Sequence, residues 1–224
     1  MELKTFNKKI ISVFNAREII KLSMDRFARM KYPKLVPIME FESERYRVSD
    51  YGQVMLLHTS SKVGMELLTA VFMPYEGNSV PFLLLDVMQM KNKRTVFVEY
   101  YDCTVNGTEQ PELTTIKEKY SSVKEYKEKP AWYVGERTPY SLIKSGEAKD
   151  DAVIEQMIMD SLKAYGTAVE KAERDPDNLK KLKVFRERMI KDGNPASDVL
   201  NKVLGIKGAA DFFRKYVMPL SENE

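Results

Sequence analysis

The sequence predicts an α+β fold in which a single domain, residues 1–224, forms an α/β/α sandwich with a central antiparallel sheet and helices on both faces. Three observations lead to this prediction. Five β-like stretches joined by short connections follow one another before residue 103, which is typical of an antiparallel meander. The stretch FLLLDVM, residues 82–88, is apolar at both alternating positions, so both faces of this strand should be covered. The second half of the chain has the apolar spacing of helices.

The first predicted element is a helix over residues 15–31. Asn15 can cap it, with Glu18 three residues later, and Pro33 and Pro37 end it. Its rough apolar stripe consists of Ile19, Ile20, Leu22, Phe27 and Met30. The polar segment before it, MELKTFNKK, is expected to be a plain terminus.

The strands of the sheet are predicted next. The connection PYEGNSVP, residues 74–81, contains Pro, Gly and Asn, which favour turns, and KNKR separates the last two strands. TVFVEYYD is β-branched and aromatic, as expected of a strand. The predicted strands are 45–49, 53–58, 66–73, 82–90 and 94–102.

Helices dominate the predicted second half. A long helix covers 151–173, where Ile154, Met157, Ile158, Leu162, Tyr165 and Val169 recur at spacings of three and four. Asp175 and Pro176 start the next helix as cap and first-turn proline, and Gly193 ends it. Two short helices, 196–204 and 208–217, are expected on either side of Gly205.

The composition excludes several classes of protein. With 36 basic and 33 acidic side chains the net charge is +3, which is too even for an extended nucleic-acid surface but allows a local basic face for an acidic partner. The single cysteine, Cys103, excludes an internal disulfide, and no apolar leader is present, so we expect a cytoplasmic protein. No apolar run approaches the length of a membrane span.

Standard catalytic motifs are absent from the sequence, and Asp86 is the anomaly. There is no glycine-rich phosphate loop, and one histidine with one cysteine nearly excludes thiolate and imidazole metal sites. Asp86 interrupts an otherwise apolar strand, where burial should raise the pKa of a carboxyl group and suit it to proton donation. Two alternatives stay open: an edge or bulge position that turns the acid to solvent, or a buried salt bridge with a lysine.

Other polar features allow structural interpretations. His58, at a strand end, is more typical of a surface or structural histidine. The thirteen methionines are core filler or the flexible lining of a site for a bulky ligand. A basic run is either a solvated helix face or a docking surface, and it consists of Lys180, Lys181, Lys183, Arg186 and Arg188.

Two blocks of sequence resemble the ferredoxin-dependent bilin reductases. In VFMPYEGNSVPFLLLDVM, Pro74, Pro81 and Asp86 keep the spacing of that family, although Leu84 replaces its usual glycine. In KDGNPASDVLNKVLGIKGAADFFRKYVMP, Asn194 stands where many members have an aspartate. The blocks cover about 50–104 and 185–219 in the correct order, and the middle aligns loosely.

The resemblance implies an α/β/α sandwich that holds biliverdin IXα between the sheet and the C-terminal helices. It implies no bound metal or flavin, with single electrons supplied by a reduced [2Fe-2S] ferredoxin and substrate supplied by a haem oxygenase. A monomer in the cytoplasm is expected, that of the host cell if the chain is phage-encoded. Asp86 and Asn194 would be the catalytic residues. The expected substrate-binding residues are Lys144, on a propionate, and Thr69, Leu57, Met88 and Phe212.

Departures from the family pattern indicate the product. Members that reduce the exocyclic vinyl group use a glutamate and a histidine at positions that here are Leu57 and Thr69, and neither is a carboxylic acid. We therefore expect no vinyl reduction and, as in the phage-type and marine-metagenome members, a four-electron reduction to phycoerythrobilin. The alternatives are a two-electron reductase, a phycocyanobilin-forming enzyme, a bilin or haem carrier without catalysis, and an interaction protein with a chance match.

Overall fold

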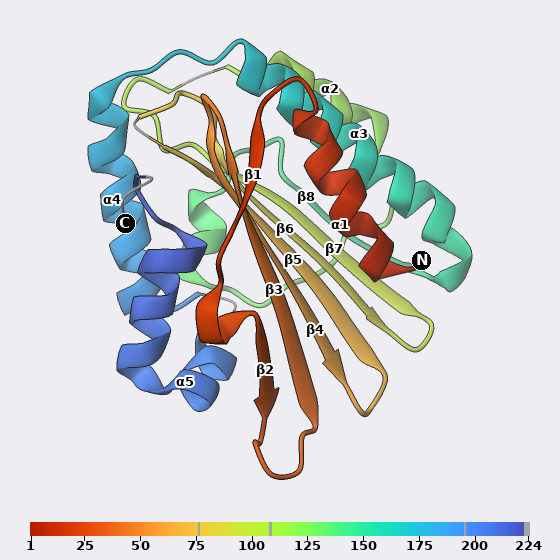
Figure 1. The fold of residues 1–224 in the computed structure, drawn as a ribbon. Coiled ribbons are helices and arrows are strands. Elements are labelled where there is room, and N and C mark those ends of the chain that lie inside the picture. The colour runs from red at the N-terminus through yellow and green to blue at the C-terminus, as the bar shows by residue number, and fades with distance from the viewer. Residues whose placement is uncertain (76, 108, 195, 222–224) are drawn as a thin grey trace.

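A single antiparallel sheet forms the centre of the computed structural model, which describes residues 1–75, 77–107, 109–194 and 196–221 (Figure 1). Within these residues the sheet has eight strands in the order β1-β3-β4-β5-β6-β7-β8, with β2 also paired to β3. The strands are β1 Ile19–Leu22, β2 Arg29–Tyr32, β3 Met39–Val48, β4 Gly52–Ser61, β5 Met65–Pro74, β6 Phe82–Met90, β7 Lys93–Tyr101 and β8 Leu142–Glu147.

Helices cover both faces of the sheet (Figure 1). α1 and α3 lie on one face, with α2 packed against α3, and α4 and α5 lie on the other. Their bounds are α1 Leu3–Ile11, α2 Pro111–Lys119, α3 Asp151–Glu170, α4 Pro176–Lys191 and α5 Ser197–Phe212, which continues into a π-helical turn at Phe213–Val217. The predicted fold class, an α/β/α sandwich around an antiparallel sheet, is confirmed.

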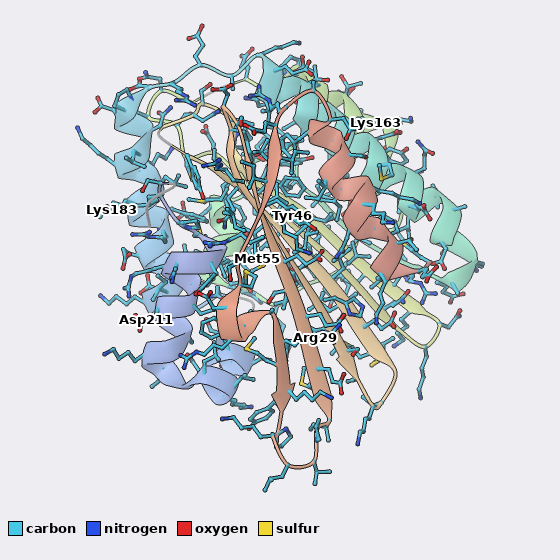
Figure 2. The ribbon with its side chains drawn as sticks, viewed as in Figure 1. Arg29, Tyr46, Met55, Lys163, Lys183 and Asp211 are labelled. Atoms are coloured by element: carbon cyan, nitrogen blue, oxygen red, sulfur yellow. The ribbon has the colours of Figure 1, made fainter. Side chains whose placement is uncertain are left out.

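Two hydrophobic cores result from this arrangement because alternate residues of a strand point to opposite faces. β6 contributes Leu83, Leu85 and Val87 to the core under α1 and α3. It contributes Phe82 and Leu84 to the core under α4 and α5, which also contains Met55 (labelled in Figure 2). The prediction that FLLLDVM is covered on both faces is therefore confirmed, and Asp86 shares the parity of Phe82 and Leu84.

The predicted helices of the second half are confirmed. α3 begins at Asp151, and the Asp175 carboxylate caps α4 by accepting a hydrogen bond from the Asp177 backbone N–H at 2.9 Å. Gly193 follows the end of α4 with a φ of 92°. The expected break at Gly205 is a kink within α5, where this glycine has a φ of 75° and a ψ of 160°.

The predicted helix over 15–31 is wrong, because this segment contains β1 and β2, which both pair with β3. The edge of β3 offers unpaired backbone groups, and pairing with them outweighs a weak helical stripe. The segment 1–9, expected to be a plain terminus, enters α1, whose Leu3, Phe6 and Ile10 are buried. β8, which is short and partly polar, was not predicted.

No helix among the described residues combines the length and the hydrophobicity needed to cross a membrane.

Candidate functional site

A largely apolar cavity lies between the sheet and the α4–α5 layer, and Asp86 is in its wall. Its empty space, including the open mouth, is about 950 Å³. Strands β3 to β6 supply one wall. The other wall is formed by the end of α4, the connection to α5, α5 itself and the turn after it. Most lining side chains are methionine, leucine, valine or phenylalanine, among them Met39, Phe41, Met55, Leu67, Val71, Leu84, Met189, Val199, Leu200 and Phe213.

Asp86 is the only ionisable residue among the described residues that line this cavity. It stands in the middle of β6, directly opposite Thr69 on β5 and Phe97 on β7. The Thr69 hydroxyl donates a hydrogen bond to the Asp86 carboxylate. The register is uninterrupted, and the described residues provide no salt bridge for this carboxylate, so neither the bulge nor the lysine pair considered from the sequence is present.

Burial raises the pKa of Asp86 from its ordinary 3.8 to about 6, although the Thr69 hydrogen bond lowers it in part. The side chain remains half-buried by surface area because the cavity touches it, while protein surrounds it on every other side. Desolvation dominates because the cavity walls are hydrocarbon and stabilise a carboxylate poorly. A carboxyl group with a pKa near 6 can hold a proton close to neutral pH and give it to a bound molecule.

Asn194 reaches the same cavity from the connection between α4 and α5. Its side-chain amide already has two backbone partners: Nδ2 donates to the Met189 carbonyl at 3.0 Å, and Oδ1 accepts from the Ala196 N–H at 3.0 Å. The Asn194 backbone N–H donates to the Ser197 hydroxyl at 2.7 Å, close to the start of α5. Asn194 therefore braces this connection, and an aspartate could not replace its N–H donor.

Four of the predicted substrate-binding residues lie on the sheet face or helix face that borders the cavity, and three of them line it. Leu57, Thr69 and Phe212 line the cavity together with Asp86 and Asn194. Met88 lies opposite Leu67 on the same sheet face, just outside the lining.

Lys144 corrects the expectation from the sequence. It pairs with Val96, which belongs to the core under α1 and α3, so it points away from the Asp86 cavity. Its ammonium group is fully buried and donates to the Glu125 carboxylate at 2.6 Å and the Val123 carbonyl at 3.0 Å. A shift of one residue along a strand reverses the face, and the loose alignment could not fix that register.

Glu99 is a second buried acid that sequence reasoning did not identify. It lies on β7 opposite Leu84, which places it diagonally from Asp86 on the same sheet face. Arg137 forms ion pairs with both Glu99 and Glu128, and the Tyr101 hydroxyl donates to Glu99 at 3.2 Å. Burial raises the pKa of Glu99 to about 7, the Arg137 charge lowers it, and the Asp86 charge raises it. The sequence did contain a sign of this acid: in VFVEYY, Glu99 alternates with Val96 and Val98 and so falls on the same strand face as Phe97 and Tyr101.

His58 faces the other side of the sheet. It pairs with Leu68, which belongs to the core under α1 and α3, and only 6% of it is exposed. Burial lowers its pKa, and its Nε2 has no hydrogen-bond partner among the described residues. His58 therefore cannot replace an acid at the neighbouring Leu57.

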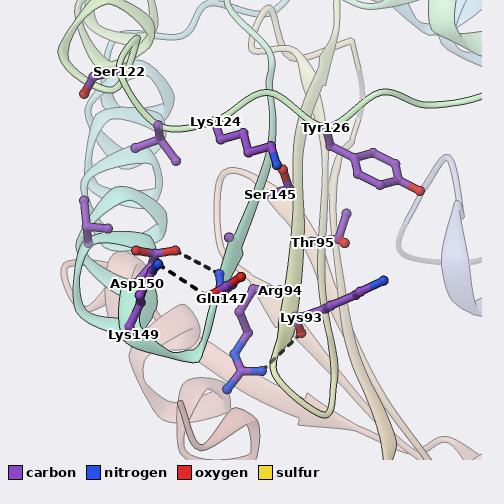
Figure 3. A pocket seen from close by; sticks show the side chains of 13 residues that line it. Lys93, Arg94, Thr95, Ser122, Lys124, Tyr126, Ser145, Glu147, Lys149 and Asp150 are labelled. Atoms are coloured by element: carbon purple, nitrogen blue, oxygen red, sulfur yellow. Dashed lines mark hydrogen bonds and ion pairs between the residues drawn. The ribbon is translucent and has the colours of Figure 1, made fainter.

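A second, polar pocket lies where β7 and β8 meet the start of α3 (Figure 3). It shares no lining residue with the Asp86 cavity. Asp150 accepts from the Glu147 backbone N–H at 2.8 Å, and Lys149 pairs with Glu147 at 3.4 Å. Arg94 forms a salt bridge with Asp151 at 2.6 Å. The Arg94–Asp151 pair holds the start of α3 against the sheet, and the Asp150 contact closes the turn that leads into this helix.

No group of three or more His, Cys, Asp or Glu side chains in the described part of the chain is arranged to hold a metal ion.

Comparisons with known proteins show the fold. The structure is similar to a crystal structure of selenomethionine phytochromobilin synthase from tomato in complex with biliverdin, with a TM-score of 0.80. The similarity covers 96% of this chain and 81% of that chain, at 11% sequence identity. No family model matches the sequence, and no curated protein matches it.

The raised pKa of Asp86 makes the stability of the protein depend on pH. The folded protein binds a proton at Asp86 that the unfolded chain has released between about pH 4 and 6, so stability falls as the pH rises through this window. An Asp86→Asn variant should therefore gain on the order of 2–3 kcal/mol over the parent between pH 3 and pH 8. Chemical denaturation of both proteins at these two pH values measures this, and an equal difference at both would contradict it.

The role of Asn194 as a brace predicts the effect of an acid there. Asn194→Asp should lower the free energy of unfolding by about 1 kcal/mol, because the Met189 carbonyl loses its donor. Asn201→Asp, at an exposed position on α5, adds the same charge and should have little effect. Thermal unfolding of the two variants separates these outcomes, and an Asn194→Asp protein as stable as the parent would show that the brace is unimportant.

Proposed function

We propose that this protein is a bilin reductase of the ferredoxin-dependent family and that it reduces biliverdin IXα in the Asp86 cavity. The observation that carries the proposal is a carboxyl group of raised pKa in an otherwise apolar cavity, on a sheet with the fold of a phytochromobilin synthase crystallised with biliverdin. The agreement of Pro74, Pro81 and Asp86 with the family spacing supports the same assignment.

The cavity suits a flat and mostly apolar tetrapyrrole. Its lining is concave and mostly apolar with a few polar groups, as is typical of small-molecule sites. Unbranched methionines such as Met39, Met55 and Met189 can adapt to the edge of a large planar ligand, and Phe212 and Phe213 offer ring contacts. The chain would bind no cofactor of its own and would act as a cytoplasmic monomer, with substrate produced by a haem-cleaving oxygenase.

Asp86 supplies the proton chemistry in this proposal. Each two-electron reduction of a bilin consumes two electrons and two protons. Adding an electron to a ligand in an apolar cavity creates a charge that the surroundings stabilise poorly, and a proton from Asp86 neutralises it. The Thr69 hydroxyl orients the carboxyl group by its hydrogen bond, so the proton is presented to the cavity and not to the strand.

The product follows from the neighbours of Asp86. Leu57 and Thr69 are directly opposite each other on β4 and β5, and Thr69 is directly opposite Asp86. Because neither Leu57 nor Thr69 is an acid, the proposal has no donor for the exocyclic vinyl group. The proposed reaction is a four-electron reduction at the 15,16 methine bridge and the A-ring diene system, which yields phycoerythrobilin.

Anaerobic incubation with biliverdin and photoreduced ferredoxin, followed by chromatography, tests the reaction. We expect phycoerythrobilin as the main product. Phycocyanobilin would contradict the assignment of the vinyl group, and a single two-electron product would limit the protein to one of the two reductions. A spectral shift of biliverdin without turnover would make the protein a bilin carrier.

The role of Asp86 is tested separately. An Asp86→Asn variant should bind biliverdin with an unchanged dissociation constant but reduce it at least about 100-fold more slowly, because the amide has no acidic proton to transfer. Asp211→Asn, at an exposed position on α5 (labelled in Figure 2), is the matched control and should react like the parent. Full turnover by the Asp86 variant would refute its role as a proton donor.

A further inference from the structure

Two of the three strand connections at one edge of the sheet expose large apolar side chains. The β2–β3, β4–β5 and β6–β7 connections lie along the lower edge of the sheet in Figure 1. Leu35 and Val36 in the first are 96% and 67% exposed, and Val63 in the second is 75% exposed. Scattered exposed apolar residues are ordinary, but a group at one edge that no described segment covers is typical of an interaction surface.

The connections are joined to one another through the ladder of the sheet. The Lys62 backbone N–H donates to the Ile38 carbonyl at 3.0 Å, which fixes the β4–β5 turn beside the β2–β3 connection. Met65, at the start of β5, pairs with Met90, at the end of β6. The exposed apolar groups are thus parts of one continuous border. We call this border the hairpin edge, defined by Lys34, Leu35, Val36, Lys62, Val63, Lys91 and Lys93.

The hairpin edge is also basic. Lys34, Lys62, Lys91 and Lys93 are exposed and form no ion pair within the described residues, and Figure 3 shows Lys93 extended away from Asp150. Acids on the adjoining strands are engaged elsewhere. Glu40 pairs with Lys31 at 3.0 Å, and Glu66 accepts from the Gln89 side chain. Glu147, opposite Lys93 on β8, pairs with Lys149 at 3.4 Å. Unneutralised lysines around apolar side chains complement a surface that is acidic with an apolar centre.

The basic run on α4 does not have this property. Lys180 pairs with Asp177 at 2.7 Å, and Arg188 pairs with Glu136 at 2.7 Å. Lys181 donates to the Thr104 carbonyl at 2.7 Å. Because much of this helix face is neutralised within the chain, α4 is the weaker of the two basic surfaces.

The hairpin edge adjoins one end of the Asp86 cavity. Met39, Thr59, Met65 and Leu67 line the cavity and belong to the same strand ends that carry the exposed connections. Met90 is four residues after Asp86 on β6, which corresponds to about 13 Å along the strand. A protein docked at this edge would therefore lie close to any ligand beside Asp86.

We propose that the hairpin edge is the docking surface for the electron donor, a small acidic iron–sulfur protein. The inference rests on the proposed bilin reductase function and names the surface that serves it. Each docked donor would give up one electron as its cluster is oxidised, and the bilin would gain that electron with one proton. Two reduced donors and two protons would therefore be used for each two-electron reduction. Such encounters bury little area and depend on charge complementarity, as four lysines around a few apolar side chains would allow.

Charge reversal at the edge tests the proposal. The triple variant Lys34→Glu, Lys62→Glu, Lys91→Glu should raise the KM for ferredoxin at least about tenfold at low ionic strength and weaken its dependence on salt. The matched control is Lys8→Glu, Lys163→Glu, Lys183→Glu, which changes three exposed lysines on α1, α3 and α4 (Lys163 and Lys183 are labelled in Figure 2). The control should stay within twofold of the parent. An unchanged KM in the triple variant, or an equal loss in the control, would overturn the docking site.

Two further measurements separate this proposal from the enzyme assignment. Biliverdin reduction driven by photoreduced viologen needs no docking, so it should be the same in the parent and the triple variant. If the parent reduces nothing under either donor, the proposed function fails, and direct titration with ferredoxin then tests the surface alone. No binding by the parent would overturn the surface as well.

A lipid surface is the competing occupant. The test is sedimentation with vesicles of phosphatidylserine and phosphatidylcholine, using the parent and a double variant, Leu35→Ser with Val36→Ser. If the parent sediments, the double variant does not, and the KM for ferredoxin is the same in both, the protein-docking proposal is overturned. Absence of sedimentation together with a raised KM in that double variant supports it.

Discussion

The position of a carboxyl group inside a strand that is covered on both faces is the constraint on which the rest of the site depends. β6 cannot turn Asp86 to solvent at an edge, because β5 and β7 pair with it on either side. A carboxyl group in contact with hydrocarbon alone would be costly, so the packing of the core under α4 and α5 must be incomplete around Asp86. The cavity, the Thr69 hydroxyl and the raised pKa of Asp86 are three consequences of this single placement. Filling the cavity with larger side chains would improve the core and would remove the space that a ligand needs.

The parts of the fold that were predictable have strong local signals. β5 and β6 are long, β-branched or apolar and bounded by prolines, and α4 has a cap, a first-turn proline and a terminal glycine. The segment before β3 was misjudged because its conformation is decided by a partner: β1 and β2 complete the edge of β3, and their local sequence alone favours a helix. α1 was missed because only three of its side chains, Leu3, Phe6 and Ile10, carry the apolar pattern.

The residues of the candidate site also differ in how far the sequence could predict them. Asp86 was predictable because it interrupts an apolar strand, and Thr69 because the family spacing counted back from Pro74 reaches it within one strand. Lys144 was misplaced because β8 is reached through a long connection, and the parity of an isolated short strand cannot be read from an uncertain alignment. Glu99 was overlooked for a different reason: its neutralising partner, Arg137, is 38 residues away in the sequence and reaches it only through the tertiary fold. Asn194 was correctly placed at the cavity, but its bonds to Met189 and Ala196 show a structural use of its amide that only coordinates reveal.

The arrangement of acids also bears on how one proton donor can serve several reduction steps. Asn194 has no acidic proton, so under the proposed function Asp86 would be the acid among the described lining residues that acts repeatedly and regains a proton between electrons. Glu99 lies on the same sheet face, and the charge of Asp86 raises the pKa of Glu99. Arg137 is shared by Glu99 and Glu128, which leaves this buried cluster with an excess of negative charge that a proton relieves. Loss of a proton from Asp86 makes that excess larger. The charges in the core under α4 and α5 therefore favour the return of a proton to Asp86 or Glu99 after each proposed transfer. No second acid in the cavity wall is required.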